Sequence, residues 1–462
     1  MDEIICQSAK SIARAVRDKT ISAVEVVEAH LRRIDEVNPA LNAVVQLSGD
    51  RALSEARQAD AALAGGDAVG PLHGVPMTIK DSLDTEGVVT TGGTKGRTGF
   101  VPEEDSTVVA RLRGAGAILL GKTNTPEFTM AGETDNLVYG RTNNPYDLSR
   151  TPGGSSGGAA AIVASGGSPL DMGSDTGGSI RLPAHFCGIA GLKPNSWRVP
   201  RTGHIVPWGL GVFDSTTQNG PMARFVEDLA LTLPIISGPD WRDPAIIDMT
   251  LQDPDKVDVS GLRVAFHTSN GIMDPTPETA KAVRAAARVL TDVGCSVEEE
   301  RPQALEMLPY LSQIDEADGW AWLRRLMDKA GTTETHPWLQ KMMDEPKVVP
   351  TDEFTALLER LDEYRSAMLS FMEGYDAILC PVAPFPAAPH GVTFEDANKF
   401  AFSYTSAYNH TGWPGAVVRG GTSPEGLPIG VQVVARPWRE EIALALAARL
   451  ESALGGWQRP SI

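Results

Sequence analysis

The residues of this chain best suited to chemistry lie in one glycine-rich stretch from Gly153 to Ser179. Nine of its 27 residues are glycine, whereas the whole chain has 46 glycines in 462 residues. Glycine weakens helices and strands alike, so this density is expected where backbone N–H groups must face a ligand. The stretch also contains two serine sites, Ser155-Ser156 and Ser179. Serines among such glycines indicate a nucleophile beside an oxyanion site.

Two further features accompany the serines. Lys80 ends the apolar run 75–79, and a lysine at a buried strand end is kept neutral by desolvation and can act as a general base. The segment 175–181, DTGGSIR, offers successive N–H groups that could form an anion-binding nest beside Ser179. Taken alone, the lysine pattern favours a surface residue, and each glycine-serine stretch is equally compatible with a flexible turn.

Two other motifs match known patterns by letter but lack the required context. Residues 116–123, GAILLGKT, fit the phosphate-loop pattern, but the four middle residues form the strand that should precede the loop. Residues 154–158, GSSGG, fit the nucleophile elbow, but a loop-like stretch precedes them instead of a strand. His390 and His410 are available as partners for that elbow, but neither lies in a recognisable context.

Composition narrows the class of protein. The chain is 42% apolar and 22% charged, with a net charge of −18, as expected for a globular protein that binds neither nucleic acid nor anionic membrane. We expect a cytoplasmic protein, because the N-terminus lacks a secretory signal and the four cysteines form no CxxC pair. The eight histidines form no metal-binding pattern, so we expect no metal and no other cofactor.

The elements that must position these residues follow from periodicity. We expect an N-terminal helical segment over 1–65, with a capping box at Ser22 and Glu25 and a helix end at Asn38-Pro39. Short apolar runs at 75–79, 117–120, 377–380 and 429–434 alternate with helical patterns, which predicts an α/β core. The core would comprise 66–302 and 376–462, interrupted by a helical insertion over 303–375, and a helix over 440–454 would close the chain.

Together, the serine, lysine and glycine segments resemble the amidase signature family. The segments that carry the resemblance are GGSSGG at 153–158, DTGGSIRLPA from Asp175, FCGIAGLKP from Phe186 and GVPMTIKD from Gly74. The resemblance implies an α/β amidase-signature fold, with a central mixed sheet covered by helices on both faces.

The resemblance also assigns roles to individual residues. It implies a Ser–Ser–Lys triad with Ser179 as nucleophile, Ser155 as bridging serine, preceded by a cis peptide bond, and Lys80 as base. It further implies an oxyanion hole formed by the backbone N–H groups of residues 176–179, that is Thr176, Gly177, Gly178 and Ser179. The residues expected to support this loop are Ser156, Asp175 and Arg181.

The substrate class is the least determined part of the sequence interpretation. The family contains free amidases and the glutamine-using subunit of a tRNA-dependent amidotransferase, which carries an aspartate where this chain has Phe402. That difference favours a stand-alone hydrolase of amides, anilides or aryl carbamates, acting as a monomer or homodimer. The residues proposed for its apolar pocket are Phe402, Trp208, Trp320, Trp322 and Trp413. The alternatives are the glutamine-using subunit of the amidotransferase and a non-catalytic scaffold, although a scaffold would be expected to lose the triad.

Overall fold

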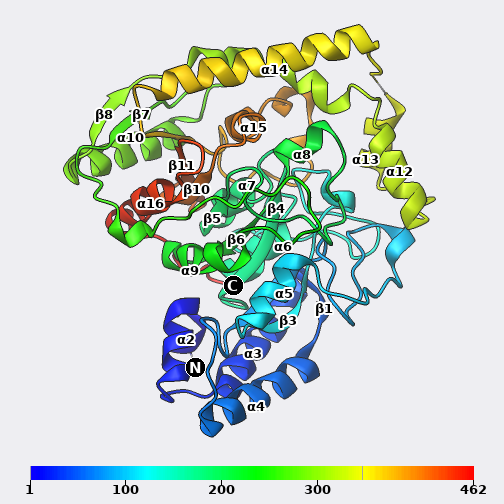
Figure 1. The fold of residues 1–462 in the computed structure, drawn as a ribbon, viewed down its shortest axis with the longest axis vertical. Coiled ribbons are helices and arrows are strands. Elements are labelled where there is room, and N and C mark those ends of the chain that lie inside the picture. Colours follow the sequence, from blue (N-terminus) through cyan, green and yellow to red (C-terminus); the bar gives the residue numbers. More distant parts are fainter. Residues whose placement is uncertain (1, 346) are drawn as a thin grey trace.

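The computed structural model describes residues 2–345 and 347–462, and its centre is one mixed sheet of 11 strands (Figure 1). The strands follow one another across the sheet in the order β1-β3-β2-β4-β6-β5-β10-β11-β9-β7-β8. Their bounds are β1 Val44–Leu47, β2 Pro76–Lys80, β3 Ile118–Thr123, β4 Leu170–Asp175, β5 Ala190–Lys193, β6 Gln218–Ala223, β7 Arg263–Phe266, β8 Ser296–Glu299, β9 Ala377–Pro381, β10 Gly415–Thr422 and β11 Pro428–Ala435.

The strand directions define how the sheet is connected. Strand β2 runs parallel to β3 and β4, while β4 pairs antiparallel with β6. Strand β10 pairs antiparallel with both β5 and β11, and β11 pairs antiparallel with β9. The last two strands of the chain therefore lie inside the sheet, between β5, which is formed much earlier in the sequence, and β9, which directly precedes them.

Helices cover both faces of this sheet. Helices α9, α10 and α16 pack together against the central strands, and α6 and α7 pack against each other and against β4, β5, β10 and β11. The helix bounds are α1 Asp2–Ile5, α2 Ala9–Arg17, α3 Ala23–Leu41, α4 Gly49–Gly65, α5 Thr107–Gly114, α6 Gly157–Ala164, α7 Arg181–Cys187, α8 Val212–Thr216, α9 Val226–Ile236, α10 Pro277–Asp292, α11 Leu308–Leu311, α12 Ala321–Ala330, α13 Pro337–Asp344, α14 Thr351–Met372, α15 Ser403–His410 and α16 Glu440–Leu454.

The structure confirms the predicted α/β class and most of the predicted elements. The four apolar runs are strands β2, β3, β9 and β11, and the closing helix is α16. Ser22 and Glu25 form the predicted capping box of α3.

Two expectations about the N-terminal segment are wrong. The segment is not wholly helical, because 44–47 form edge strand β1, which pairs antiparallel with β3. Helix α3 also continues through Pro39 to Leu41. Pro39 removes one backbone N–H donor from the last turns of α3, and Asn42 caps the helix in a left-handed conformation.

Residues 303–345 and 347–372 form the helices α11 to α14 and short 3-10 turns between strands β8 and β9. In Figure 1 these helices run along the top of the molecule and down its right side. No helix in the described part of the chain has the length and apolar character needed to cross a bilayer.

Candidate active site

Lys80 lies at the carboxyl end of β2, completely buried. Its Nζ lies 2.6 Å from Ser155 Oγ and 2.9 Å from Ser174 Oγ. Burial lowers the pKa of Lys80 to about 7, against the opposing effect of the Asp175 and Asp171 carboxylates. A substantial fraction of this lysine is therefore neutral near pH 7, as a general base must be.

Ser155 lies in the turn that leads into α6. The peptide bond between Gly154 and Ser155 is cis, at the position that the resemblance implies. A Cβ atom at Gly154 would lie 2.6 Å from the carbonyl oxygen of Ala131, so only glycine fits this close backbone approach. The last element before this turn is the 3-10 turn Glu127–Thr129, so no strand leads directly into it within the described residues, which agrees with the rejection of the nucleophile elbow.

Ser179 lies in the loop between β4 and α7, directly beside the Ser155 turn. The backbone N–H of Ser156 donates to the carbonyl of Ser179 at 3.2 Å, which joins the two serine segments. Gly178 has a φ of +137°, and a Cβ there would lie 2.3 Å from Thr405 Oγ1. The loop therefore requires glycine immediately before the expected nucleophile.

The expected oxyanion donors differ in availability. The backbone N–H of Gly178 already donates to Asp175 Oδ1 at 2.9 Å, so this expected donor is engaged in the structure. The N–H groups of Gly177 and Ser179 donate to no acceptor within the described residues. The Thr405 hydroxyl holds the carbonyl of Gly177 at 2.6 Å, which fixes the orientation of this peptide.

A buried ion pair supports the Ser179 loop. Asp175 and Arg181 form two hydrogen bonds of 3.0 Å, and both side chains are completely buried. Burial alone would raise the pKa of Asp175, but the Arg181 guanidinium holds it well below its usual range. Asn409 also donates to Asp175 at 2.8 Å and accepts from Arg181. The structure thus gives Asp175 and Arg181 the supporting positions expected from the sequence.

Ser156, the third expected supporting residue, is buried behind the same loop. Its hydroxyl lies 3.3 Å from the carbonyl oxygen and 3.4 Å from the backbone nitrogen of Ser174. These long contacts place Ser156 against β4, and within the described residues the hydroxyl that contacts Lys80 from this turn is that of Ser155.

A pocket of about 240 Å³ opens beside Ser179. Its wall consists mainly of glycine backbone and apolar side chains, and Phe402 and Trp338 provide the large aromatic surfaces. The complete lining is Thr129, Met130, Ala131, Gly132, Gly154, Thr176, Gly177, Gly178, Ser179, Trp338, Phe402 and Ser406. The arrangement can bind an apolar or aromatic group next to Ser179.

Comparison with known proteins identifies the family. The model of the Amidase family matches residues 25–444. The chain belongs to the amidase signature family.

Similar proteins of this family are named for different activities. An acylamidase from Rhodococcus erythropolis is 35% identical, with 96% of this chain and 95% of the relative covered. A glutamyl-tRNA(Gln) amidotransferase subunit from Roseiflexus is 36% identical, with 92% of both chains covered. The crystal structure of a bacterial aryl acylamidase superposes with a TM-score of 0.83 at 28% identity, covering 97% and 96% of the two chains. This chain is accordingly an amidase-signature amidohydrolase.

The structure places the four tryptophans expected in the amidase pocket elsewhere. Trp320 and Trp322 are buried in an apolar cluster with Met130 and Trp338, one layer behind the pocket wall. Trp413 is buried in a different cluster beneath α14, and Trp208 is 39% exposed on the surface. Phe402 is the member of the expected set that lines the pocket. The insertion contributes Trp338 to the pocket wall.

Sequence reasoning missed Ser174 and His204, and it left Trp338 out of the proposed pocket set although this residue belongs to the same aromatic insertion. Ser174 directly precedes the DTGGS segment, which was a usable signal. No sequence pattern indicated His204, because its contact with Ser174 depends on a loop that folds back against the sheet.

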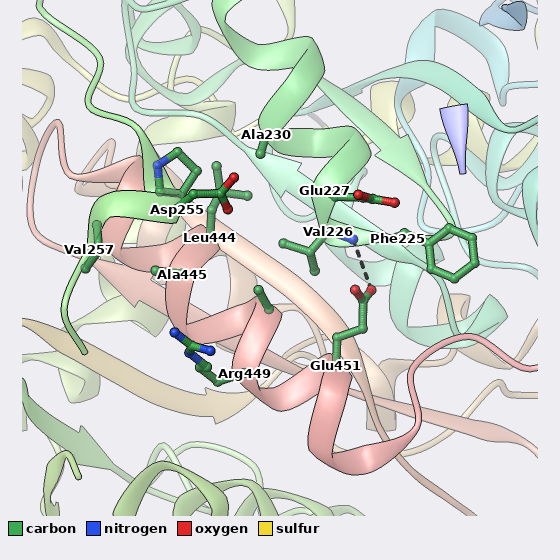
Figure 2. Close-up of a pocket in the computed structure, with 12 residues that line it drawn as sticks. Phe225, Val226, Glu227, Ala230, Asp255, Val257, Leu444, Ala445, Arg449 and Glu451 are labelled. Carbon is green, nitrogen blue, oxygen red and sulfur yellow. Dashed lines mark hydrogen bonds between the residues drawn. The ribbon is translucent and has the colours of Figure 1, made fainter. Parts of the chain in front are cut away.

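Another pocket, of about 310 Å³, lies between α9 and α16 (Figure 2). Glu451 of α16 accepts a hydrogen bond from the Val226 backbone N–H at the start of α9, at 3.0 Å. Lys80, Ser155 and Ser179 do not line this pocket. Across residues 2–345 and 347–462, no three His, Cys, Asp or Glu side chains are grouped so as to hold a metal ion.

Proposed function

We propose that this amidase, acting alone, hydrolyses amides with bulky apolar or aromatic parts, including anilides and aryl carbamates, through an acyl-enzyme on Ser179. The observation that carries the proposal is the buried Lys80–Ser155 contact of 2.6 Å beside a Ser179 loop that lines an apolar pocket.

The first half of the reaction forms the acyl-enzyme. Neutral Lys80 accepts the proton of Ser155, and Ser155 accepts the proton of Ser179 as the Ser179 oxygen attacks the carbonyl carbon. The N–H groups of Gly177 and Ser179, together with that of Thr176, stabilise the oxyanion. Each such donor contributes about 3–4 kcal/mol in other hydrolases.

The second half releases both products. Ser155 returns a proton to the leaving amine as the carbon–nitrogen bond breaks, and Lys80 thereby becomes neutral again. Water then attacks the acyl carbonyl while the same chain of groups removes its proton. The reaction needs no metal or cofactor for this proton transfer, since Lys80 and Ser155 carry both protons.

The pocket wall supports the apolar substrate class. Phe402 lies against Gly132, where an added Cβ would come within 2.2 Å of its ring. Trp338 packs against Phe394 with ring centroids 5.2 Å apart. An α-ammonium group of glutamine beside Phe402 would lose hydration without gaining a partner. The acylamidase and the aryl acylamidase described above bear names that agree with this substrate class.

The alternative function is that of the glutamine-hydrolysing subunit of a tRNA-dependent amidotransferase. The 36% identity with one protein of that kind favours it. Phe402 argues against it, since the position lines the pocket beside Ser179.

A substrate panel tests the proposal. The purified protein is assayed alone with glutamine, aliphatic amides, anilides and aryl carbamates, and kcat/KM is compared. We expect anilides or aryl carbamates to be turned over best, Ser179→Ala to be inactive and Ser156→Ala to keep turnover. Preference for glutamine refutes the apolar substrate class, and activity only with partner subunits and tRNA establishes the alternative. Full turnover by Ser179→Ala refutes the triad assignment.

A further inference from the structure

A buried histidine extends the hydrogen-bond chain of the triad. His204 Nε2 lies 3.0 Å from Ser174 Oγ, and the same oxygen lies 2.9 Å from Lys80 Nζ. His204 and Ser174 are both buried. The chain of contacts therefore runs from His204 through Ser174 to Lys80 and on to Ser155.

The backbone holds His204 firmly in this place. Its loop joins the segment that follows Lys80, because the N–H of Asp84 donates to the carbonyl of Gly203 and the N–H of Ile205 donates to the carbonyl of Ser82, both at 2.8 Å. An isolated β-bridge also pairs His204 with Leu83. The imidazole is thus fixed relative to the lysine and cannot be a freely rotating surface group.

Hydrogen-bond counting shows why this contact matters. A neutral lysine has two N–H donors and one lone pair. To act as a base toward Ser155, Lys80 must keep that lone pair free of Ser174. Ser174 can then only accept from Lys80, and its own hydroxyl proton needs an acceptor elsewhere. His204 Nε2 is the remaining contact of Ser174 Oγ that can accept it.

We propose that His204 is a positioning residue that accepts the Ser174 hydroxyl proton and so reserves the Lys80 lone pair for Ser155. The inference rests on the proposed role of Lys80 as base. It requires the tautomer in which His204 Nδ1–H donates to the Val206 carbonyl, which lies 3.0 Å away. In the other tautomer, Nδ1 accepts from the Val206 N–H at 3.1 Å, and the Ser174 proton turns toward Lys80.

The charges around Lys80 and His204 favour a neutral imidazole at His204. Burial, and next the charge of Lys80, lower the pKa of His204 to about 3, with smaller effects of Arg201 and Arg97. The carboxylates that face Lys80 are Asp175 and Asp171, both on β4. His204 therefore carries no proton on Nε2 near pH 7 in the required tautomer.

Two polar substitutions separate this role from a purely structural one. The side chain of His204→Gln reaches the Nε2 position and can accept from Ser174, whereas that of His204→Asn reaches only the Nδ1 position near Val206. We expect His204→Asn to lower kcat by about tenfold or more, within the range of proton-transfer effects, with little change in KM. We expect His204→Gln to restore most of the loss. His30→Asn, at another fully buried histidine that contacts only the carbonyl of Val26, is the matched control for folding.

The pH profile and a double variant complete the test. In His204→Asn the Ser174 proton binds the Lys80 lone pair, so the acid limb of kcat/KM moves to lower pH. In a Ser174→Ala background, His204→Asn should change kcat by less than about twofold, because the two residues act as one unit. Equal kcat and acid limbs in His204→Asn and wild type, or additive effects in the double variant, overturn the inference. Full turnover by Lys80→Met refutes the proposed function itself, whatever the His204 variants do.

Discussion

Replacing Lys80 with methionine should make the protein inactive but more stable. Methionine is similar in length and carries no charge that must be desolvated. Lys80 is completely buried and contacts only hydroxyl groups through its Nζ atom. The native fold therefore accommodates a cation at a position that an apolar side chain occupies at lower cost.

The size of the effect follows from the pKa of Lys80. Burial lowers this pKa from 10.5 to about 7, which corresponds to about 5 kcal/mol at about 1.4 kcal/mol per unit. The variant leaves the hydroxyls of Ser155 and Ser174 without their lysine partner, at a cost of about 1–2 kcal/mol each. We therefore expect the free energy of unfolding to rise by about 1–3 kcal/mol below pH 7.

The sign of the pH dependence distinguishes this explanation from better packing. Between pH 7 and 10.5 the unfolded lysine is protonated and the native lysine is neutral. The unfolded state then binds more protons, so the wild type gains stability as pH rises through this window. The advantage of Lys80→Met should be constant below pH 7 and shrink by about 1.4 kcal/mol per pH unit above it.

Urea unfolding of both proteins at several pH values measures this difference. Lys122→Met is the matched control, since Lys122 is equally buried and burial lowers its pKa to about 8. The gain in stability of Lys122→Met should begin to shrink one pH unit higher than that of Lys80→Met. A Lys80→Met variant that is less stable than wild type at all pH values, or whose advantage does not depend on pH, refutes the reasoning.

Three further outcomes are expected. Gly178→Ala should lower kcat by about 100-fold without unfolding, because its Cβ would displace the loop from Thr405; unchanged kinetics would contradict this. Arg181→Met should lower the free energy of unfolding by about 3–5 kcal/mol in chemical denaturation, because it leaves Asp175 charged and buried; a loss below about 1 kcal/mol would argue against it. The kcat/KM of the wild type should fall about tenfold per pH unit below about pH 7, as Lys80 becomes protonated; a flat profile across neutral pH would exclude this lysine as the base.

Hydrophobic periodicity predicted the strands inside the sheet well and the strand at its edge poorly. The runs that became β2 and β11 are almost fully apolar because helices cover both of their faces. Strand β1 is four residues long and half exposed at the sheet edge, so its residues carry no clear pattern. Its pairing with β3 depends on a partner more than 70 residues away in the sequence, which no local signal encodes.

Residue patterns indicated a serine nucleophile, a lysine base and an anion-binding loop, but only the resemblance joined them into one site. Lys80 and Ser155 are 75 residues apart, and nothing in their spacing places them in contact. The tryptophans show the limit of composition, since Trp320 and Trp322 are large enough to pack behind the wall that Trp338 forms. His204 depends on backbone hydrogen bonds between two loops, which a pattern of side chains cannot reveal.

The position of β10 and β11 inside the sheet has a consequence for synthesis of the protein. These strands are translated last, yet they join β5 to β9. Asn409 and Gln432, from the same part of the chain, accept hydrogen bonds from Arg181, which supports the Ser179 loop. A chain that is still emerging from the ribosome has two separate groups of strands and an unsupported Ser179. We therefore expect hydrolytic activity to appear only after the C-terminal strands insert, and a chain truncated before Asn409 to be inactive.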